Sequence, residues 1–353
     1  MNPAYLLRAL TVAVISVWLA TSPAAAQDKP GQSKPDQTKL DKVSFGTNWV
    51  PEAEHGGFFQ ALADGTYKKY GLDVTIVPGG PNTNNRILEI AGKLDFYMAA
   101  NSLMSFDAVA NHVPVVSVAA IFQKDPQVFL THPETRATKL TDLKPLTLFV
   151  SKEGMTSYFQ WLKSEYGFSG KNVRSYTFNP QPFLATPRSA MQGYVTSEPF
   201  AIEKSAGFKP GIFLLADYGF NDYSTLIETR RELIDKKPDL VQRFVDASII
   251  GWYHYLYGDN SAGNALIKKL NPEMTDQLLA YSVKAMKKYG IVDSGDALKD
   301  GIGAMSGERI TSFFQKMVRA GVEHPDIDYR KSYTLRFVNK GVGLDLRPKS
   351  AKN

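Results

Sequence analysis

Side chains able to hold a flat organic molecule follow several predicted strands of this sequence. Trp49 offers an aromatic face, and Glu198 offers the one fixed charge among these strand ends. Ligands bind beyond the carboxyl ends of the strands in open parallel sheets, so these side chains are predicted to line a pocket. Stacking and a few directed hydrogen bonds suit a flat solute that is neutral or weakly cationic. Further candidates, chosen by position alone, are Asn48, Asn101, Ser102, Asn179, Tyr194 and Tyr223.

Each of these side chains also has a purely structural interpretation. Trp49 could pack on the helix that follows it, because tryptophans are largely buried on average, although a strand end is an awkward place for interior packing. Glu198 precedes Pro199, so it could be an acid in the first turn of a short helix, where carboxylates are favoured. Ser102 is a common helix-capping residue type, and a capping residue can still contact a ligand. The sequence alone leaves these alternatives open.

The sequence lacks the patterns of a catalytic or metal centre. It has no cysteine, which removes disulfides, thiolate zinc sites, iron–sulfur clusters and cysteine nucleophiles. Its five histidines are dispersed, and no nucleophile-elbow, Walker or dinucleotide-binding glycine motif occurs. Glu52, Glu54 and His55 are predicted to lie in a loop with no further metal-ligand cluster. We therefore expect no catalytic residue, no metal and no cofactor.

The N-terminal stretch has the pattern of a secretory signal peptide. Arg8 precedes the apolar residues 9–20, and Ala24 and Ala26 precede Gln27, which fits the small-residue rule for cleavage. The apolar core is shorter than the ~20 residues that a bilayer span needs, although a buried or membrane-spanning segment is the alternative. We expect cleavage near Ala26, and no cysteine follows it to carry a lipid anchor. These features predict a soluble periplasmic protein without membrane insertion.

The charge distribution does not favour nucleic acid as a partner. The chain has 41 Lys and Arg and 35 Asp and Glu. Loss of residues 1–26 removes one arginine and no acid, which leaves a formal charge of +5. The basic residues are scattered along predicted helices beside acids, without an aromatic-interleaved basic stripe. Solvated helix faces explain this pattern.

Apolar or β-branched runs alternate with helical patterns along much of the chain, which is typical of parallel βαβ units. The pattern restarts after residue 138, which predicts a second α/β lobe, and from Pro238 onward the chain turns mainly helical. The clearest helix is expected over residues 272–289, with Asn271 as its cap. The predicted strands are 43–47, 74–77, 96–99, 115–122, 128–131, 147–150 and 173–178, and the helices between them are 57–64, 86–91, 103–111 and 156–166.

Two motifs resemble those of a known family. The first runs from Asn48-Trp49-Val50-Pro51 through His55-Gly56-Gly57-Phe58-Phe59 to Tyr70-Gly71-Leu72-Asp73-Val74, and the second is Gly193-Tyr194-Val195-Thr196-Ser197-Glu198-Pro199. In order and separation they resemble the thiamine-pyrimidine-synthase-like and sulfonate-binding-like solute-binding proteins of periplasmic ABC transporters. The resemblance spans nearly the whole chain after the signal peptide.

The resemblance implies the α/β, two-lobed type II periplasmic binding fold with a helical C-terminal tail. The chain would then cross between the lobes twice, on two long strands, and the expected crossings are residues 115–131 and 212–217. The expected division is a signal peptide, 1–26; a flexible leader, 27–40; lobe 1, 41–125 and 225–345; lobe 2, 126–224; and a C-terminal tail, 346–353.

The resemblance also implies roles and partners. Trp49 would stack on a solute ring, and Glu198 would accept hydrogen bonds from an exocyclic amine or a ring N–H. The partners would be a small-molecule solute, such as a thiamine-pyrimidine precursor or a flavin, and the membrane permease of an ABC importer. One alternative is a sulfonate or other small oxyanion bound at helix N-termini. Another is the family's pyrimidine-forming enzyme, which resembles this chain at His55 but has a cysteine-rich motif that this chain lacks.

Overall fold

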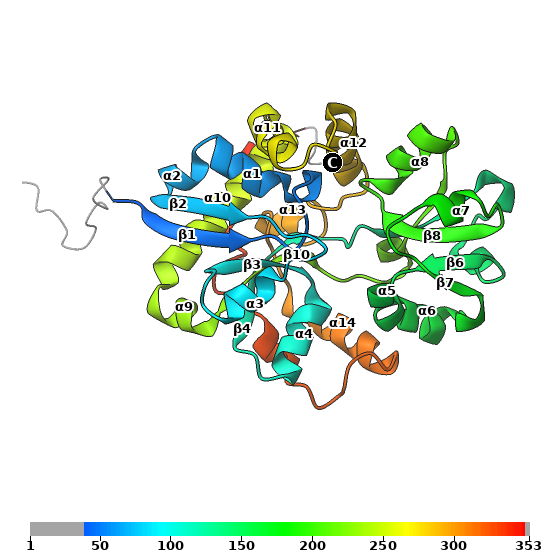
Figure 1. Ribbon diagram of the computed structural model, residues 1–353. Coiled ribbons are helices and arrows are strands. Elements are labelled where there is room, and N and C mark those ends of the chain that lie inside the picture. The colour runs from blue at the N-terminus through cyan, green and yellow to red at the C-terminus, as the bar shows by residue number, and fades with distance from the viewer. Residues whose placement is uncertain (1–38, 350–353) are drawn as a thin grey trace, which may run out of the picture. The chain divides into compact units, whose positions relative to one another are not determined.

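The computed structural model describes residues 39–349, which form one unit around two five-stranded sheets (Figure 1). The predicted signal peptide, the leader up to residue 38 and residues 350–353 of the tail lie outside the described residues. The first sheet has the strand order β2-β1-β3-β10-β4. Its strands are β1 (Asp41–Gly46), β2 (Leu72–Val77), β3 (Phe96–Asn101), β4 (Val115–Phe122) and β10 (Ser224–Arg230).

The second sheet has the strand order β7-β6-β8-β5-β9 and lies beside the first in Figure 1. Its strands come from one continuous stretch of chain, so the second sheet interrupts the first in sequence. They are β5 (Gln127–Thr131), β6 (Thr147–Val150), β7 (Val173–Ser175), β8 (Ser189–Tyr194) and β9 (Gly211–Leu214).

Both sheets are mixed: they contain the parallel units that the alternation predicts, together with antiparallel strands. In the first sheet β1 runs parallel to β2 and β3, whereas β10 is antiparallel to β3 and β4. In the second sheet β6 is parallel to β7 and β8, whereas β5 is antiparallel to β8 and β9. The local alternation of apolar and helical segments does not encode the direction of a strand that arrives from the other sheet.

The helices cover both sheets, and none within residues 39–349 combines the length and apolarity that a membrane crossing requires. The helices packed around the sheets are α1 (Gly56–Ala63), α2 (Thr66–Lys69), α3 (Asn85–Ile90), α4 (Ser102–Ala110), α5 (Lys152–Thr156), α6 (Tyr158–Tyr166), α7 (Gln181–Leu184) and α8 (Glu198–Ala206). The later helices are α9 (Arg231–Lys236), α10 (Pro238–Tyr257), α11 (Ser261–Leu270), α12 (Asp276–Lys288), α13 (Ala297–Asp300) and α14 (Gly307–Arg319). The 3-10 turns are η1 (Ala53–His55), η2 (Pro133–Thr135), η3 (Leu140–Leu143), η4 (Gly170–Asn172), η5 (Leu215–Tyr218), η6 (Tyr329–Ser332) and η7 (Leu344–Leu346).

α10 is the helix that fixes α1 against the first sheet. Its Phe244 ring stacks on Phe96 of β3 at a centroid distance of 4.1 Å. α10 also approaches α1 so closely that a Cβ atom on Gly57 would lie 2.2 Å from the Trp252 ring. Glycine is therefore required at Gly57 for the two helices to meet. Since η1 immediately precedes α1, this contact also fixes η1.

The helix expected over residues 272–289 is shorter in the structure, and its cap is a different residue. α12 begins at Asp276, and Thr275 Oγ1 accepts a hydrogen bond from the Leu278 N–H at 3.2 Å. Asn271 instead donates from Nδ2 to the Pro51 carbonyl at 2.9 Å. Asn271 therefore holds the segment that leads into η1, a role that its spacing from an apolar run does not reveal.

Two short links join the sheets, in place of the two long strands that we expected. The first link is residues 123–126, between β4 and β5, where Pro126 has no N–H for a strand ladder and Asp125 Oδ1 accepts from the Gln127 N–H at 2.8 Å. The second link is residues 215–223, which begins as η5 and leads to β10. The crossing expected over residues 212–217 therefore includes only the first part of this second link.

Arg309 of α14 ties the two links together. Its Nη2 donates to the carbonyls of Gln123 in the first link and Asp222 in the second, the latter at 3.2 Å, and its Nε donates to the Asn221 carbonyl at 3.0 Å. A Lys124–Asp217 ion pair at 2.7 Å adds a direct bridge between the links. The junction between the sheets is thus cross-braced by side chains rather than by a continuous strand.

Candidate functional site

An aromatic pair joins the ends of two strands that belong to different sheets. Trp49 follows β1, Phe178 follows β7, and their ring centroids lie 5.6 Å apart with an interplanar angle of 40°. Phe178 also lies 5.5 Å from the Tyr176 ring, so the aromatic row extends into the second sheet. Trp49 is half-buried, and the Phe178 side chain is 60% exposed. The aromatic surface at the junction is therefore open to a solute.

Phe178 was not among the chosen site residues, although it ends the strand predicted over residues 173–178. β7 ends at Ser175, and the backbone of Phe178 has a φ of 62°, in the left-handed region. Bulky residues rarely adopt this conformation, and such outliers concentrate at ligand clamps and other functional positions. The turn at Phe178 directs its ring onto Trp49, which a regular strand would not do.

The backbone of Trp49 is held by its neighbours. Its carbonyl accepts hydrogen bonds from Thr47 Oγ1 at 2.8 Å and from the Gly79 N–H at 3.1 Å. A Cβ atom on Gly79 would lie 2.4 Å from the Thr47 carbonyl oxygen. Gly79 is thus needed for the close approach of two loops, rather than only for a tight turn.

Glu198 has both a structural contact and a free oxygen. It is the first residue of α8, as the helix-start alternative required, and its Oε2 accepts from the Tyr194 N–H at 2.7 Å and from Ser197 Oγ at 2.6 Å. Within residues 39–349 its Oε1 has no hydrogen-bond partner. Burial raises the pKa of Glu198, and the hydrogen bonds from Ser197 and Tyr194 oppose that rise. One carboxylate oxygen is fixed, and the other remains available.

Two further glutamates lie within electrostatic reach of Glu198, and we call Glu52, Glu54 and Glu198 the carboxylate cluster. Burial raises the pKa of Glu54 to about 7, and the nearby Glu198 charge adds to this rise. Burial also raises the pKa of Glu52 well above its usual value, with further contributions from Glu54 and Glu198. Glu52 and Glu54 flank Ala53 in the sequence, at the start of η1, whereas Glu198 is the first residue of α8.

Glu54 and His55 lie in the 3-10 turn η1 rather than in an irregular loop, and the electrostatic influence of Glu198 on Glu52 and Glu54 was not predicted. The local sequence carries no signal for it, because Glu198 is distant in the chain. The His55 side chain is buried, and burial lowers its pKa to about 3, so its imidazole is neutral near pH 7. Within residues 39–349 no ion pair involves a member of the cluster, and no group of His, Cys, Asp and Glu is arranged to hold a metal ion.

The remaining predicted site residues fall into two places. Tyr194 lies beside Glu198, since its N–H donates to Glu198 Oε2 at 2.7 Å. Burial raises the pKa of Tyr194, and the charges of Asp125, Glu52, Glu198 and Glu54 add to that rise. Asn48 adjoins Trp49 and is half-buried. Asn179 is exposed near Phe178, where its Oδ1 accepts from the Gln181 N–H at 3.0 Å.

Ser102 and Tyr223 meet at a different point, below the end of β3. Both line a cavity of about 10 Å³, close to the least volume that holds one water molecule. Tyr223 Oη donates to Asp296 and accepts from the Ser306 N–H at 2.8 Å. Asn101, rather than Ser102, caps α4 by accepting from the Met104 N–H at 3.4 Å. The hydrogen bonds of Asn101 and Tyr223 serve the fold, and the ligand roles of all eight residues stay predictions.

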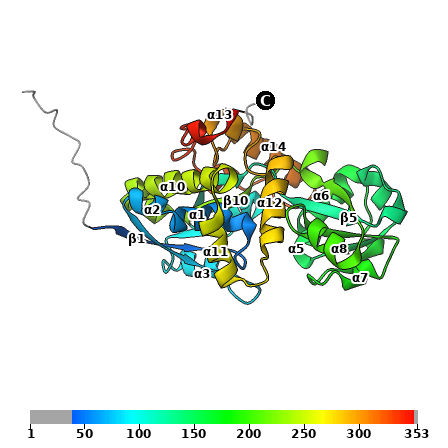
Figure 2. The same cartoon turned by 90° about the horizontal axis from the view of Figure 1, so that it is seen from above.

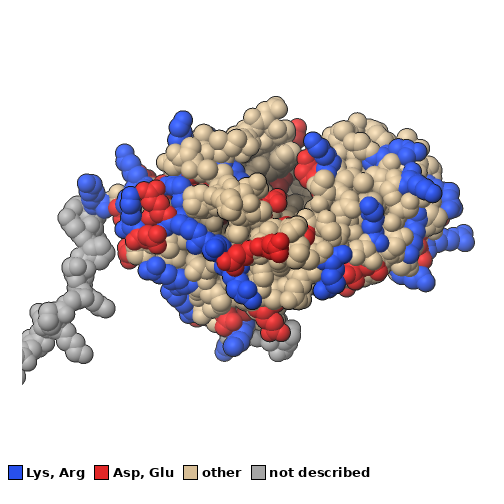
Figure 3. Space-filling model, turned by 90° about the horizontal axis from the view of Figure 1, so that it is seen from below, with Lys and Arg blue, Asp and Glu red and all other residues tan. Residues whose placement is uncertain are grey.

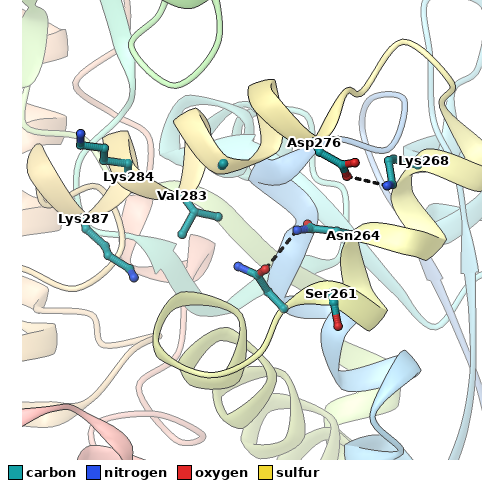
Figure 4. A pocket seen from close by; sticks show the side chains of 9 residues that line it. Ser261, Asn264, Lys268, Asp276, Val283, Lys284 and Lys287 are labelled. Atoms are coloured by element: carbon teal, nitrogen blue, oxygen red, sulfur yellow. Dashed lines mark hydrogen bonds and ion pairs between the residues drawn. The ribbon is translucent and has the colours of Figure 1, made fainter.

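The surface has a hollow between the two halves of the molecule and a separate groove between two helices. Figure 3 shows one face hollowed between the two halves, with Asp or Glu side chains at the hollow. A groove of about 530 Å³ lies between α11 and α12 (Figure 4). Its Lys268 is paired with Asp276, and it contains none of the predicted site residues. We therefore place the candidate site at the junction of the sheets.

The arrangement of the sheets is that of the two-lobed type II periplasmic binding proteins, which confirms the predicted α/β fold class with its helical C-terminal tail. The structure is similar to the periplasmic aliphatic sulphonate binding protein SsuA from Escherichia coli. The TM-score is 0.62 at 12% identity, and the match covers 83% of this chain and 92% of that chain.

The chain belongs to the NMT1/THI5-like family, whose model matches residues 52–259. The riboflavin-binding protein RibY of Chloroflexus aurantiacus is 22% identical over 354 residues, which covers 95% of this chain and 99% of that protein. The 4-amino-5-hydroxymethyl-2-methylpyrimidine phosphate synthase THI11 of Saccharomyces cerevisiae is 25% identical over 295 residues, which covers 78% of this chain and 77% of that protein. The relatives of this chain thus include one protein named for binding and one named for synthesis.

Proposed function

We propose that this chain is the periplasmic solute-binding component of an ABC importer and binds an aromatic heterocycle, such as a thiamine-pyrimidine precursor, between its lobes. The observation that carries the proposal is the Trp49–Phe178 pair, whose centroids lie 5.6 Å apart across the junction. A flat ring stacks on such aromatic surfaces with little loss of conformational entropy. The free oxygen of Glu198 then accepts a hydrogen bond from an amine or a ring N–H.

Binding proceeds by closure of the lobes. The solute first docks on Trp49, and the second lobe then brings Phe178, Tyr194 and Glu198 onto it. A solute favours closure only by the contacts that it gains in the closed state. The two links and their Arg309 brace form the hinge for this motion. The closed form docks on a membrane permease that is driven by ATP hydrolysis in the cytoplasm.

Two other functions are compatible with the family. Import of a sulfonate is suggested by the fold shared with SsuA, but the carboxylate cluster repels an anion. Synthesis of a pyrimidine is suggested by the name of the yeast relative. The pyrimidine-forming enzyme that the sequence resembles has a cysteine-rich motif, however, and this chain has no cysteine. Both are therefore second to solute binding.

Calorimetry with Trp49 variants tests the proposal. Because stacking of a ring on an aromatic side chain contributes about 1 to 3 kcal/mol, Trp49→Ala is expected to weaken binding of the aminopyrimidine or riboflavin by roughly 5- to 150-fold. Trp49→Phe keeps an aromatic face and should retain most of the affinity. Tyr70→Ala removes a half-buried aromatic residue near the opposite end of β2 and serves as the control.

The alternatives give distinct results in the same experiment. Binding of an alkanesulfonate by the parent chain, with no binding of any heterocycle, supports the sulfonate importer. Conversion of a bound heterocycle, detected by mass spectrometry of the small molecules released from the purified protein, supports the enzyme. Equal affinity of the parent and Trp49→Ala for every heterocycle contradicts the proposed site.

A further inference from the structure

We infer that α12 forms a latch between the two lobes, and that Tyr281 and Ser282 are positioning residues that hold the segment before Glu198. The latch is the set of contacts that Gln277, Tyr281 and Ser282 make with the second lobe. This inference rests on the proposed function and adds to it the groups that stabilise the closed arrangement of the lobes. The geometry points to it because one helix of the first lobe makes hydrogen bonds to the second.

α12 is anchored to the first lobe at both of its ends. At its start Asp276 pairs with Lys268 of α11 at 2.5 Å. Just after its end the Ile291 carbonyl accepts from the N–H groups of Gln123 and Lys124 in the first link, at 2.7 and 3.1 Å. Figure 2 shows α12 between the helices of the first sheet and the second lobe, and it contacts both η1 and α8. The helix therefore belongs to the first lobe and reaches the second.

Two consecutive side chains of α12 bond to the main chain of the second lobe. Ser282 Oγ donates to the Thr196 carbonyl at 2.7 Å, and Tyr281 Oη donates to the Val195 carbonyl at 3.2 Å. The Tyr281 ring also lies against Phe200 of α8, at a centroid distance of 5.4 Å. Because both acceptors are main-chain carbonyls, these bonds fix the path of the second lobe's backbone relative to the first lobe.

A third contact lies one turn earlier on α12. Lys204 Nζ of α8 donates to Gln277 Oε1 at 2.5 Å, and both side chains are exposed. The latch thus consists of a few polar contacts and one aromatic contact, without a large apolar interface. Contacts of this kind form and break at modest cost, as a reversible closure requires.

The segment that the latch holds also carries residues of the candidate site. β8 ends at Tyr194 and α8 begins at Glu198. Glu198 Oε2 accepts from the Tyr194 N–H at 2.7 Å, which closes residues 194–198 into a turn. The two carbonyls that α12 holds lie inside this turn. A solute that contacts Tyr194 or Glu198 therefore contacts a segment whose position depends on α12.

Ser282 has a second acceptor to which it can turn when the lobes separate. Its Oγ lies 2.8 Å from the Leu278 carbonyl oxygen, one turn earlier in α12. A hydroxyl has one proton to donate, so it serves either the Leu278 or the Thr196 carbonyl. A buried donor without an acceptor is costly, and the Leu278 carbonyl removes that cost in the open arrangement. The Ser282 hydroxyl is therefore paired in both arrangements.

Small-angle scattering in the absence of any solute tests the latch itself. The double variant Tyr281→Phe with Ser282→Ala removes the two hydroxyls and keeps an aromatic ring against Phe200. We expect its radius of gyration to exceed that of the parent chain, because the lobes separate more often. Should the double variant fail to fold, Tyr281→Phe and Gln277→Ala replace it, at a half-buried and an exposed position.

Stopped-flow kinetics test the connection between the latch and the site. The probes are 4-amino-5-hydroxymethyl-2-methylpyrimidine and riboflavin, and tryptophan fluorescence follows their release. Loss of two hydrogen bonds that are made only in the closed arrangement should raise the dissociation rate roughly 10-fold in the double variant. The association rate should not fall, because the surface that the solute first meets is unchanged.

Two control variants lie on the same helices but outside the latch. Tyr289→Phe removes a hydroxyl just after α12, where the Tyr289 ring contacts Lys288. Glu203→Gln alters α8 at an exposed position, where Glu203 pairs with Lys209. Thermal unfolding of each variant shows that it is folded before its radius and rates are compared.

The outcomes distinguish this inference from the proposed function. A radius of gyration equal to that of Tyr289→Phe overturns the latch, whatever the probes do. A larger radius with an unchanged dissociation rate overturns the positioning role of Tyr281 and Ser282. If neither probe binds the parent chain while the radius still increases, the proposed function fails and the latch stands as a property of the fold.

Discussion

Glu54 and His55 are neighbours in η1, and burial shifts their pKa values in opposite directions. The pKa of Glu54 rises to about 7, so folding retains a proton that the unfolded carboxyl gives up above its ordinary value of 4.5. The stabilisation from Glu54 is thus present below pH 4.5 and is lost as the pH rises to about 7. The pKa of His55 falls to about 3, so the unfolded state gains a proton below pH 6.5 that the folded state refuses. Stability is then lost as the pH falls from 6.5 toward 3.

Glu54→Gln should remove the loss at the alkaline end of this range. Relative to the parent, we expect its free energy of unfolding to gain on the order of 3 kcal/mol between about pH 4.5 and pH 8, since a pKa shift of one unit corresponds to about 1.4 kcal/mol. Urea unfolding of both proteins at several pH values measures this difference. If the difference stays constant, as it should for the control Glu203→Gln, Glu54 ionises as an ordinary surface carboxyl.

At the scale of elements, α14 acts on the hinge without touching the aromatic pair. Arg309 donates to carbonyls in both links, and its guanidinium lies 4.0 Å from the centroid of the Tyr223 ring. A single side chain therefore couples the two crossings of the chain. Its removal should affect stability and the relative motion of the lobes rather than the surface that a solute contacts.

Arg309→Ala is expected to lower the free energy of unfolding by on the order of 3 kcal/mol, because hydrogen bonds from charged groups contribute about 1.5 to 3 kcal/mol each. Small-angle scattering should show a larger radius of gyration in the absence of solute. Arg319→Ala is the control on the same helix, since Arg319 is exposed. Scattering and stability indistinguishable from this control would mean that the links hold their geometry unaided.

The strand predictions were most accurate where the local sequence pattern was strong. Residues 115–122 and 147–150 are strands with the predicted bounds, because β-branched and aromatic runs bounded by turn residues specify them locally. The direction of β10, the turn at Phe178 and the convergence of Glu52 and Glu54 with Glu198 depend on contacts between distant segments. Trp49 and Glu198 could be chosen from the sequence because each follows a predicted strand. The residues that surround them in the structure could not be predicted.

At the scale of the whole molecule, the last described residues stabilise the helical region. Arg347 is 6% exposed, and its Nε donates to Asp293 Oδ2 at 2.8 Å while its Nη1 donates to the Leu298 carbonyl at 2.9 Å. Tyr257 of α10 donates to the same Asp293 oxygen at 2.7 Å. This buried ion pair joins the C-terminal segment to the helix that lies against the first sheet.

Arg347→Ala should lower the free energy of unfolding by about 3 to 5 kcal/mol, because it leaves the buried Asp293 carboxylate without its counter-ion. Thermal unfolding of the variant, compared with Lys349→Ala at an exposed position nearby, measures the effect. A melting temperature equal to that of the control would show that the C-terminal segment contributes nothing to the fold.

The position of β10 between β3 and β4 dictates an order of assembly. As the polypeptide is synthesised from its N-terminus, every strand of the second sheet has emerged by residue 214, whereas β10, which lies between β3 and β4 in the first sheet, begins only at residue 224. Until then β3 and β4 present open edges, which are templates for wrong pairing. The second sheet, which carries Phe178 and Glu198, can therefore form before the first sheet is complete. The surroundings of Trp49 form only when β10 pairs with β3 and β4.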